Sequence, residues 1–256
     1  MTEISIARQS TRKSTWFELA IVFALSLGAS AFYSVVSLIA ALTAPKGLSG
    51  SSQSLNPTLA SREWLDFSYQ ALGLTFGVAP VALALYLLWN SGRSPFNDIG
   101  LNLKRLGWST NRALILASAI GIPGLGLYVS ARMLGLSAKI IPADLGGYWW
   151  TIPVLLLAAL RAALLEEVLV IAYLFDRLER IGFSFRIQLL ISSTLRASYH
   201  LYQGFGGFVG NFAMGLAFGW AYKRWGRVMP LVIAHFILDA VSFVGYATLS
   251  HLVQLP

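Results

Sequence analysis

The stretch "VLLLAALRAALLEEVLVIAYLF", residues 154–175, decides the fold, because it is an apolar run interrupted only by Arg161, Glu166 and Glu167. A helix needs about 20 apolar residues to cross a hydrocarbon core of ~30 Å, and this run is long enough. Two adjacent carboxylates are costly in such a place, because little water is present to solvate their charge. The stretch therefore predicts a membrane-spanning helix with an acidic pair that needs partners.

The composition of the whole chain also indicates a membrane protein. Of its 256 residues, 56% are hydrophobic and 12% are charged, whereas soluble domains carry about 25% charged residues. The chain has no cysteine, which excludes a disulfide framework, a cysteine-ligated zinc and a thiol nucleophile. The net charge of +8 does not indicate nucleic-acid binding, because the cations lie in short clusters between apolar runs.

The apolar runs predict an all-α fold, a polytopic transmembrane helical bundle with about seven spans. Helices are favoured over a β-barrel because the runs are continuous rather than alternating. The first run is too long for a signal peptide, whose apolar region has about 7–15 residues. An eighth segment would arise if the glycine-rich stretch 202–222 were partly re-entrant. The predicted spans are 17–42, 67–89, 112–134, 150–175, 187–202, 206–222 and 228–249.

The distribution of Lys and Arg predicts the orientation. Thirteen lie in the N-terminus and in every second connection, and four lie in the other connections. The positive-inside rule then places the N-terminus in the cytoplasm. The thirteen are Arg8, Arg12, Lys13, Arg93, Lys104, Arg105, Arg112, Arg177, Arg180, Arg186, Lys223, Arg224 and Arg227.

We single out seven ionisable residues within the predicted spans, all of them in the C-terminal half. Each costs about 2.5–3.5 kcal/mol on the insertion scale, so a functional role is the default interpretation. We expect no comparable residue in the N-terminal half. The seven are Arg161, Glu166, Glu167, Arg196, His200, His235 and Asp239.

The spacing of these residues indicates which of them share a helix face. His235 and Asp239 are four residues apart, as are Arg196 and His200, so each pair lies on one face. Glu166 and its neighbour point about 100° apart on a helix. We therefore expect one glutamate to face a cavity and the other to support it or meet a cation such as Arg196. The rise of ~1.5 Å per residue brings Glu166, His200 and His235 to similar depths in the membrane.

A glutamate and two histidines at one depth suit the activation of water. A desolvated glutamate can act as a general base, a neutral histidine can assist it, and a second histidine can stabilise an oxyanion. The same set could instead ligate a divalent metal such as zinc. A structural ion-pair network is the alternative for the acidic pair. Gln203 and Asn211 are weaker site candidates, and the glycine pairs within 204–219 favour close helix packing.

Two stretches, "EEVLVIAYLFDRL" (166–178) and "LRASYHLYQGFGGFVGNFAMGLAFGWAYKRWGRVMPLVIAHFILDA" (195–240), resemble the CPBP intramembrane proteases. That family includes the CAAX prenyl endopeptidases and the lysostaphin resistance protein A-like proteins. The resemblance covers about residues 150–245. It implies an N-terminal region, 1–149, with the first three spans, and a catalytic helical core, 150–256, within one membrane domain.

The motifs of the family match in part. Glu166 and Glu167 match the glutamate pair, but Ile171 stands where the family has an arginine. Arg196 replaces the phenylalanine of the Phe-x-x-x-His motif that ends at His200. We hypothesise that Arg196 supplies from another span the cation lost at Ile171, neutralising Glu167 and leaving Glu166 as the base. His235-x-x-x-Asp239 matches the third motif.

What the resemblance implies is hydrolysis of a peptide bond by water that Glu166 activates. His200 would assist, and His235 with Asp239 would stabilise the oxyanion. Where a metal takes part, its ligands would be Glu166, His200 and His235. The implied partners are a peptide or membrane-anchored protein substrate and the lipid bilayer of the cell membrane, with no nucleic acid.

Two other interpretations stay open. A non-catalytic relative acting as an immunity or scaffold protein would explain the motif departures. A proton-coupled transporter would use the same ionisable residues as a relay, but it would predict an inverted repeat. The ionisable residues instead cluster in one half of the chain.

Overall fold

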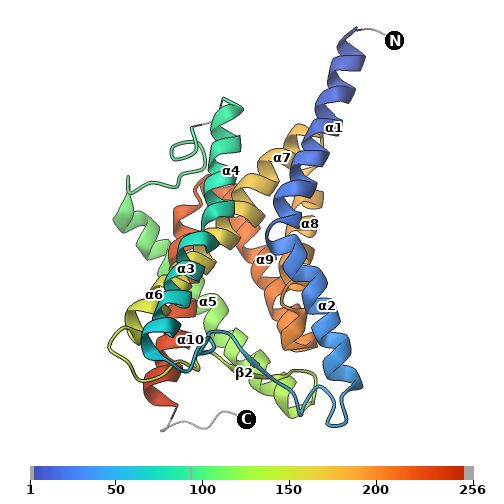
Figure 1. The fold of residues 1–256 in the computed structure, drawn as a ribbon. Helices are drawn as coiled ribbons and strands as arrows, with labels where there is room; N and C mark the ends of the chain where they lie inside the picture. Colours follow the sequence, from blue (N-terminus) through green and yellow to red (C-terminus); the bar gives the residue numbers. More distant parts are fainter. Residues whose placement is uncertain (1–2, 93, 251–256) are drawn as a thin grey trace.

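The computed structural model describes residues 3–92 and 94–250, with side chains from Arg12 onward. It is all-α apart from two very short strands, and its helices run up and down through the molecule (Figure 1). Helix α1 begins and α10 ends at opposite ends of the bundle (Figure 1). Of the cations that predicted the orientation, Arg93 and the side chain of Arg8 lie outside the described part.

The N-terminal half forms three long helical units. α1 (Glu3–Ala24) and α2 (Leu27–Thr43) form the first unit, with a bend of 55° between them. α3 (Glu63–Gly77) and α4 (Ala79–Asn90) form the second unit, and α5 (Leu106–Met133) forms the third. Each unit covers one of the predicted spans 17–42, 67–89 and 112–134.

Two loops between these helices meet in a small parallel sheet. β1 (Ser52–Ser54) pairs with β2 (Lys139–Ile141), with Gln53 opposite Ile140. This pairing ties the loop after α2 to the loop after α5 at one end of the molecule (Figure 1).

The C-terminal half matches the predicted positions of the other four spans. α6 (Thr151–Glu166), the π-helix η1 (Glu167–Tyr173) and α7 (Leu174–Arg180) follow one another without a break. α8 (Phe185–Ser198) is followed by the 3₁₀ turn η2 (Leu201–Gln203), and then come α9 (Phe205–Trp225) and α10 (Met229–Leu249).

Several helices are long and apolar enough to cross a membrane, which indicates a multi-pass membrane protein. By length and composition they are Glu63–Asn90, Leu106–Met133 and Met229–Leu249, and the bent α1–α2 pair makes a possible fourth. The expected number of seven is not shown by this criterion. α8 has 14 residues, which is about 21 Å of helix, and it carries Arg186 and Arg196.

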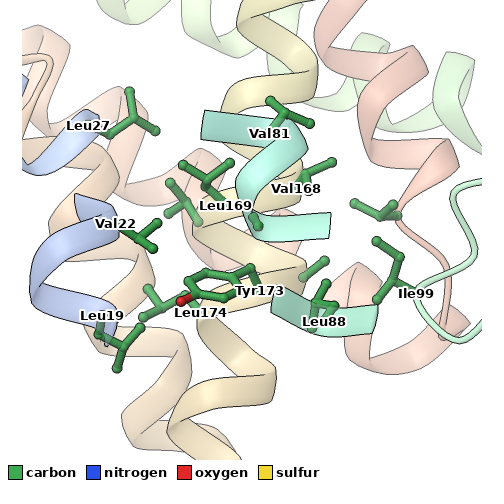
Figure 2. Packing of buried hydrophobic residues seen from close by; sticks show 14 of the residues in the cluster. Leu19, Val22, Leu27, Val81, Leu88, Ile99, Val168, Leu169, Tyr173 and Leu174 are labelled. Carbon is green, nitrogen blue, oxygen red and sulfur yellow. The ribbon is translucent and has the colours of Figure 1, made fainter. Parts of the chain in front are cut away.

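The main hydrophobic core surrounds the π-helix η1. All seven residues of η1 are buried, and Val168, Leu169 and Tyr173 pack against side chains from α1, α2 and α4 (Figure 2). The neighbours include Leu19, Val22, Leu27, Val81 and Leu88 (Figure 2). This packing holds η1 on several sides and fixes the direction of the glutamates at its start.

Glycines let α8 and α9 approach closely, as the sequence predicts. A Cβ added at Gly215 would lie 2.8 Å from the Cα of Ser193, and one added at Gly219 would collide with Leu189. A side chain at either position would push the helices apart. The close approach brings α8, with Arg196 and His200 at its end, against the rest of the core.

The prediction that the N-terminal half has no comparable ionisable residue is wrong, because of Glu18. This residue of α1 accepts hydrogen bonds from the hydroxyl of Tyr173 at 2.7 Å and from Nε of Arg177 at 2.6 Å. Arg177 also pairs with Asp176, and Asp176 with Arg180. The sequence shows Glu18 at the start of the predicted span 17–42 but does not show its partners, which lie about 155 residues further along the chain.

Candidate active site

The two glutamates lie at the junction of α6 and η1. Glu166 is the last residue of α6 and Glu167 is the first of the π-helix. Single π turns within α-helices are rare and occur often at functional sites, because the wider turn redirects side chains. At this junction both carboxylates reach the same neighbour, Arg196.

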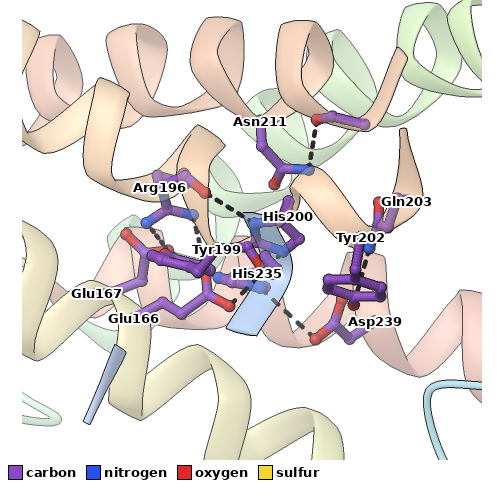
Figure 3. Close-up of polar contacts among 12 residues, drawn as sticks. Glu166, Glu167, Arg196, Tyr199, His200, Tyr202, Gln203, Asn211, His235 and Asp239 are labelled. Carbon is purple, nitrogen blue, oxygen red and sulfur yellow. Dashed lines mark hydrogen bonds and ion pairs between the residues drawn. The ribbon is translucent and has the colours of Figure 1, made fainter. Parts of the chain in front are cut away.

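Arg196 joins the two glutamates. Its Nη2 donates to Oε1 of Glu167 at 2.7 Å, and its Nη1 forms an ion pair with Oε2 of Glu166 at 3.3 Å (Figure 3). The side chains of Arg196 and Glu167 are fully buried, and the ring of Phe218 lies 5.4 Å from the guanidinium. The forked guanidinium has separate N–H groups for two acceptors, so it can balance an adjacent acidic pair.

His235 extends the network from α10. Its Nδ1 lies 2.7 Å from Oε1 of Glu167, and its Nε2 lies 3.5 Å from Oδ2 of Asp239 (Figure 3). Both ring nitrogens therefore face carboxylate oxygens. The second distance is long for a hydrogen bond, so Nε2 is held less firmly than Nδ1.

His200 approaches the other glutamate. Its Nδ1 lies 2.9 Å from the carbonyl oxygen of Arg196, and a carbonyl only accepts, so this nitrogen is the donor. In the neutral ring the lone pair is then on Nε2. That atom lies 4.0 Å from Oε1 of Glu166, a distance too long for a direct hydrogen bond.

The exposure of the side chains changes across the site in one direction. Arg196 and Glu167 are 0% exposed, Glu166 is 10%, His200 is 15% and Asp239 is 24%. The more exposed side of the site is therefore that of His200 and Asp239. The Glu167 side is a dry ion-pair network.

The structure brings together the six residues that the sequence singled out as site residues. The interactions given above link Glu166, Glu167, Arg196, His200, His235 and Asp239.

Both glutamates meet Arg196, but Glu167 is nearer to it, at 2.7 Å against 3.3 Å for Glu166. Arg161 lies apart from them, as its helix angle predicts, and its Nη1 donates to the carbonyl of Gly73 at 3.4 Å. The hydrogen bonds of Gln203 and Asn211 go to Tyr202 and Gly207 in the described part of the chain.

Sequence reasoning missed Tyr199. Its hydroxyl donates to Oε2 of Glu166 at 2.8 Å, and both groups are buried. The only signal in the sequence is that Tyr199 precedes His200. Chain proximity alone does not show that the hydroxyl turns toward a residue 33 positions away.

The same cluster could hold a metal ion. One ligand atom each from Glu166, Glu167 and His235 lies within 4.8 Å of the other two. The ligand set predicted from the sequence has His200 in place of Glu167. The donor chemistry fits poorly, because Nδ1 of His235 and a guanidinium N–H both meet Oε1 of Glu167. A metal would have to displace these hydrogen bonds and lie next to the Arg196 cation.

Comparisons with known proteins support the resemblance drawn from the motifs. No match was found among the curated proteins or among the solved structures. Residues 148–241 match the family model described as type II CAAX prenyl endopeptidase Rce1-like. The matched region contains all six site residues and suggests a protease that acts on peptide substrates. The resemblance to the CPBP proteases is therefore confirmed over residues 148–241, which form an Rce1-like region of this chain.

Proposed function

We propose that this protein is an intramembrane endopeptidase that hydrolyses peptide bonds in peptide or membrane-anchored protein substrates. The observation that carries the proposal is the gap of 4.0 Å between Oε1 of Glu166 and Nε2 of His200, on the exposed side of the site. Both atoms are acceptors, and the space between them suits one water molecule. The proposal rests also on the Rce1-like match of the same region.

The geometry supports the following course of reaction. A water molecule between Glu166 and His200 donates one hydrogen bond to each acceptor, and its lone pair attacks the carbonyl carbon of the substrate. Glu166 takes one proton as the new C–O bond forms. It then delivers that proton to the leaving nitrogen as the C–N bond breaks, so the products are a carboxylic acid and an amine.

His235 and Asp239 serve the oxyanion in this proposal. Because Nδ1 of His235 donates to Glu167, an N–H at Nε2 requires the imidazolium form, which the carboxylates of Glu167 and Asp239 on its two sides favour. This N–H lies 3.5 Å from Asp239, so it can turn to a developing negative charge. Asp239 on the same helix face keeps the ring in that orientation. Glu167 fixes the opposite nitrogen at 2.7 Å.

Arg196 takes the role of the motif arginine, whose position is occupied by Ile171 in this chain. Ile171 is 0% exposed in the apolar core, so no cation is available from that position. Arg196 comes from α8 and contacts Glu167 more closely than Glu166. It thereby neutralises Glu167 in the dry part of the site and leaves Glu166 free to act as the base.

The proposed setting is the cell membrane. We place the N-terminus in the cytoplasm, with seven crossings, one of which is the short helix α8. Residues 1–149 form the N-terminal helices and residues 150–256 form the catalytic core of one membrane domain. The substrate is a peptide or a membrane-anchored protein that reaches His200 and Asp239 from the exposed side.

The experiment compares the purified protein with its Glu166→Ala variant on a membrane proteome, with detection of new peptide termini. We expect wild-type protein to generate termini that Glu166→Ala does not. Glu63→Ala is the control, because this exposed glutamate lies on α3 and not in the site. Equal termini from a well-folded Glu166→Ala variant, or none from the wild type, would contradict the proposal and favour a non-catalytic immunity or scaffold role.

A further inference from the structure

We propose that Tyr199 is a positioning residue for Glu166, and that Ser34 of α2 holds Tyr199 in place. This inference rests on the proposed function and adds two residues to it. Ser34 lies far outside the Rce1-like region of 148–241, so the inference also assigns a role to the N-terminal half of the chain.

Tyr199 contacts the carboxylate of Glu166 directly. The tyrosine hydroxyl donates to Oε2 of Glu166 at 2.8 Å, and Nη1 of Arg196 lies 3.3 Å from the same oxygen. The other oxygen, Oε1, faces His200. Tyr199 and Arg196 therefore occupy one oxygen of the base and leave the other for the water.

Tyr199 lies directly after the last residue of α8. The helix ends at Ser198, and carbonyl groups in the last turn of a helix have no partner within the helix. The hydroxyl of Ser34 donates to the carbonyl oxygen of Tyr199 at 2.7 Å, and both residues are buried. Ser34 thus satisfies a buried acceptor and fixes the backbone from which the tyrosine side chain extends.

Tyr199 also lies beside His200. The rings of Tyr199 and His200 have centroids 4.7 Å apart, and α2 passes close to this part of the site (Figure 3). A shift of the Tyr199 backbone would therefore move both Glu166 and His200. The two atoms that hold the water depend on this one segment.

The experiment measures kcat and KM on a quenched fluorescent peptide that spans a cleavage site found in the proteome comparison. We expect Tyr199→Phe to lower kcat by roughly ten- to hundredfold and to leave KM nearly unchanged. This factor corresponds to the free energy of one hydrogen bond to a charged group. Ser34→Ala should lower kcat several-fold. The double variant should lose little more than Tyr199→Phe, because both act through the same carboxylate.

Matched controls separate positioning from general stability. Tyr173→Phe removes a partly buried tyrosine–glutamate hydrogen bond outside the site, that to Glu18. Ser30→Ala removes an exposed hydroxyl from the same helix as Ser34. Both should keep the wild-type kcat, even where Tyr173→Phe lowers the melting temperature.

The outcomes distinguish this inference from the proposed function. If cleavage requires Glu166 but the kcat of Tyr199→Phe equals that of Tyr173→Phe, the proposed function stands and the inference is wrong. If Tyr199→Phe does not fold, Ser34→Ala decides, and a kcat equal to that of Ser30→Ala overturns the inference. If the wild type yields no cleavage site at all, the proposed function itself fails and the inference fails with it.

Discussion

Glu166 and Glu167 share one buried cation, and this arrangement explains how adjacent carboxylates can exist among apolar helices. Removing one partner of a buried ion pair costs about 3–5 kcal/mol, because the other charge is left without compensation. Arg196 is the partner of both glutamates, at 2.7 Å from Glu167 and 3.3 Å from Glu166. Its replacement therefore has the largest expected effect of any single change in the site.

We predict different results for two substitutions of this arginine. Arg196→Leu removes the guanidinium that bridges two buried carboxylates and should greatly reduce the yield of folded protein. Arg196→Lys keeps the charge but lacks the fork, so it should fold and lower kcat by roughly ten- to hundredfold, as expected for one lost charge-assisted hydrogen bond. Size-exclusion chromatography and peptide cleavage measure the two effects. A well-folded and fully active Arg196→Leu variant would remove the role given to this cation.

The same cation predicts the response to metal removal. Because the guanidinium lies beside the oxygens that a metal would use, we expect 1,10-phenanthroline to leave the cleavage rate unchanged within about twofold. Added zinc should not stimulate cleavage. The measurement is peptide cleavage before and after dialysis against the chelator. Loss of activity that zinc restores would instead assign Glu166, Glu167 and His235 as metal ligands.

At the scale of elements, the π-helix η1 connects two polar clusters. Glu167 at its start belongs to the candidate site, and Tyr173 at its end hydrogen-bonds to Glu18 of α1. Arg177, one turn further on, binds the same glutamate and also the carbonyl of Leu87 in α4. The second cluster therefore joins α1, α4 and α7, and it holds the end of η1 opposite to the site.

We predict that Glu18→Gln destabilises the protein without abolishing catalysis. The change removes the charge that Arg177 meets at 2.6 Å, so the cost should be about 1–3 kcal/mol. Thermal unfolding in detergent should show a lower melting temperature than wild type. Glu63→Gln, an exposed glutamate on α3, is the control and should unfold as wild type does. Equal melting temperatures for both variants would show that the cluster adds no stability.

At the scale of the whole molecule, the helices and the loops that join them define two ends. The ends of α4 and α7 and the start of α1 lie toward one end of the molecule, and the β1–β2 sheet lies toward the other (Figure 1). Lys104 and Arg105 lie between α4 and α5, and Arg227 lies between α9 and α10; by the positive-inside rule we expect these connections in the cytoplasm.

This orientation can be tested by single cysteines, because the chain has none of its own. We expect Ser61→Cys, at an exposed position after β1, to react with a membrane-impermeant thiol reagent on intact cells. Asn97→Cys, exposed in the loop after α4, should react only after the membrane is made permeable. Mass spectrometry or a gel shift reads the labelling. The reverse pattern would place the N-terminus outside the cell.

The sequence by itself determined the class of fold, the positions of the helices and the residues of the candidate site. Long apolar runs fix where helices can lie in a bilayer, and ionisable residues within them are rare enough to stand out. The boundaries of α5, α9 and α10 lie within a few residues of the predicted spans, apart from the start of α5, which begins at Leu106. The motifs around Glu166, His200 and His235 also predicted the matched family region.

Only the tertiary structure decided which groups meet. The π turn at Glu167, the reach of Arg196 to both glutamates and the hydroxyl of Tyr199 on Glu166 depend on contacts between separate helices. Nothing in the sequence indicates the partners of Ser34 and Glu18, because those partners lie more than 150 residues away. Periodicity and composition describe one segment at a time, whereas hydrogen bonds between helices depend on how those segments pack.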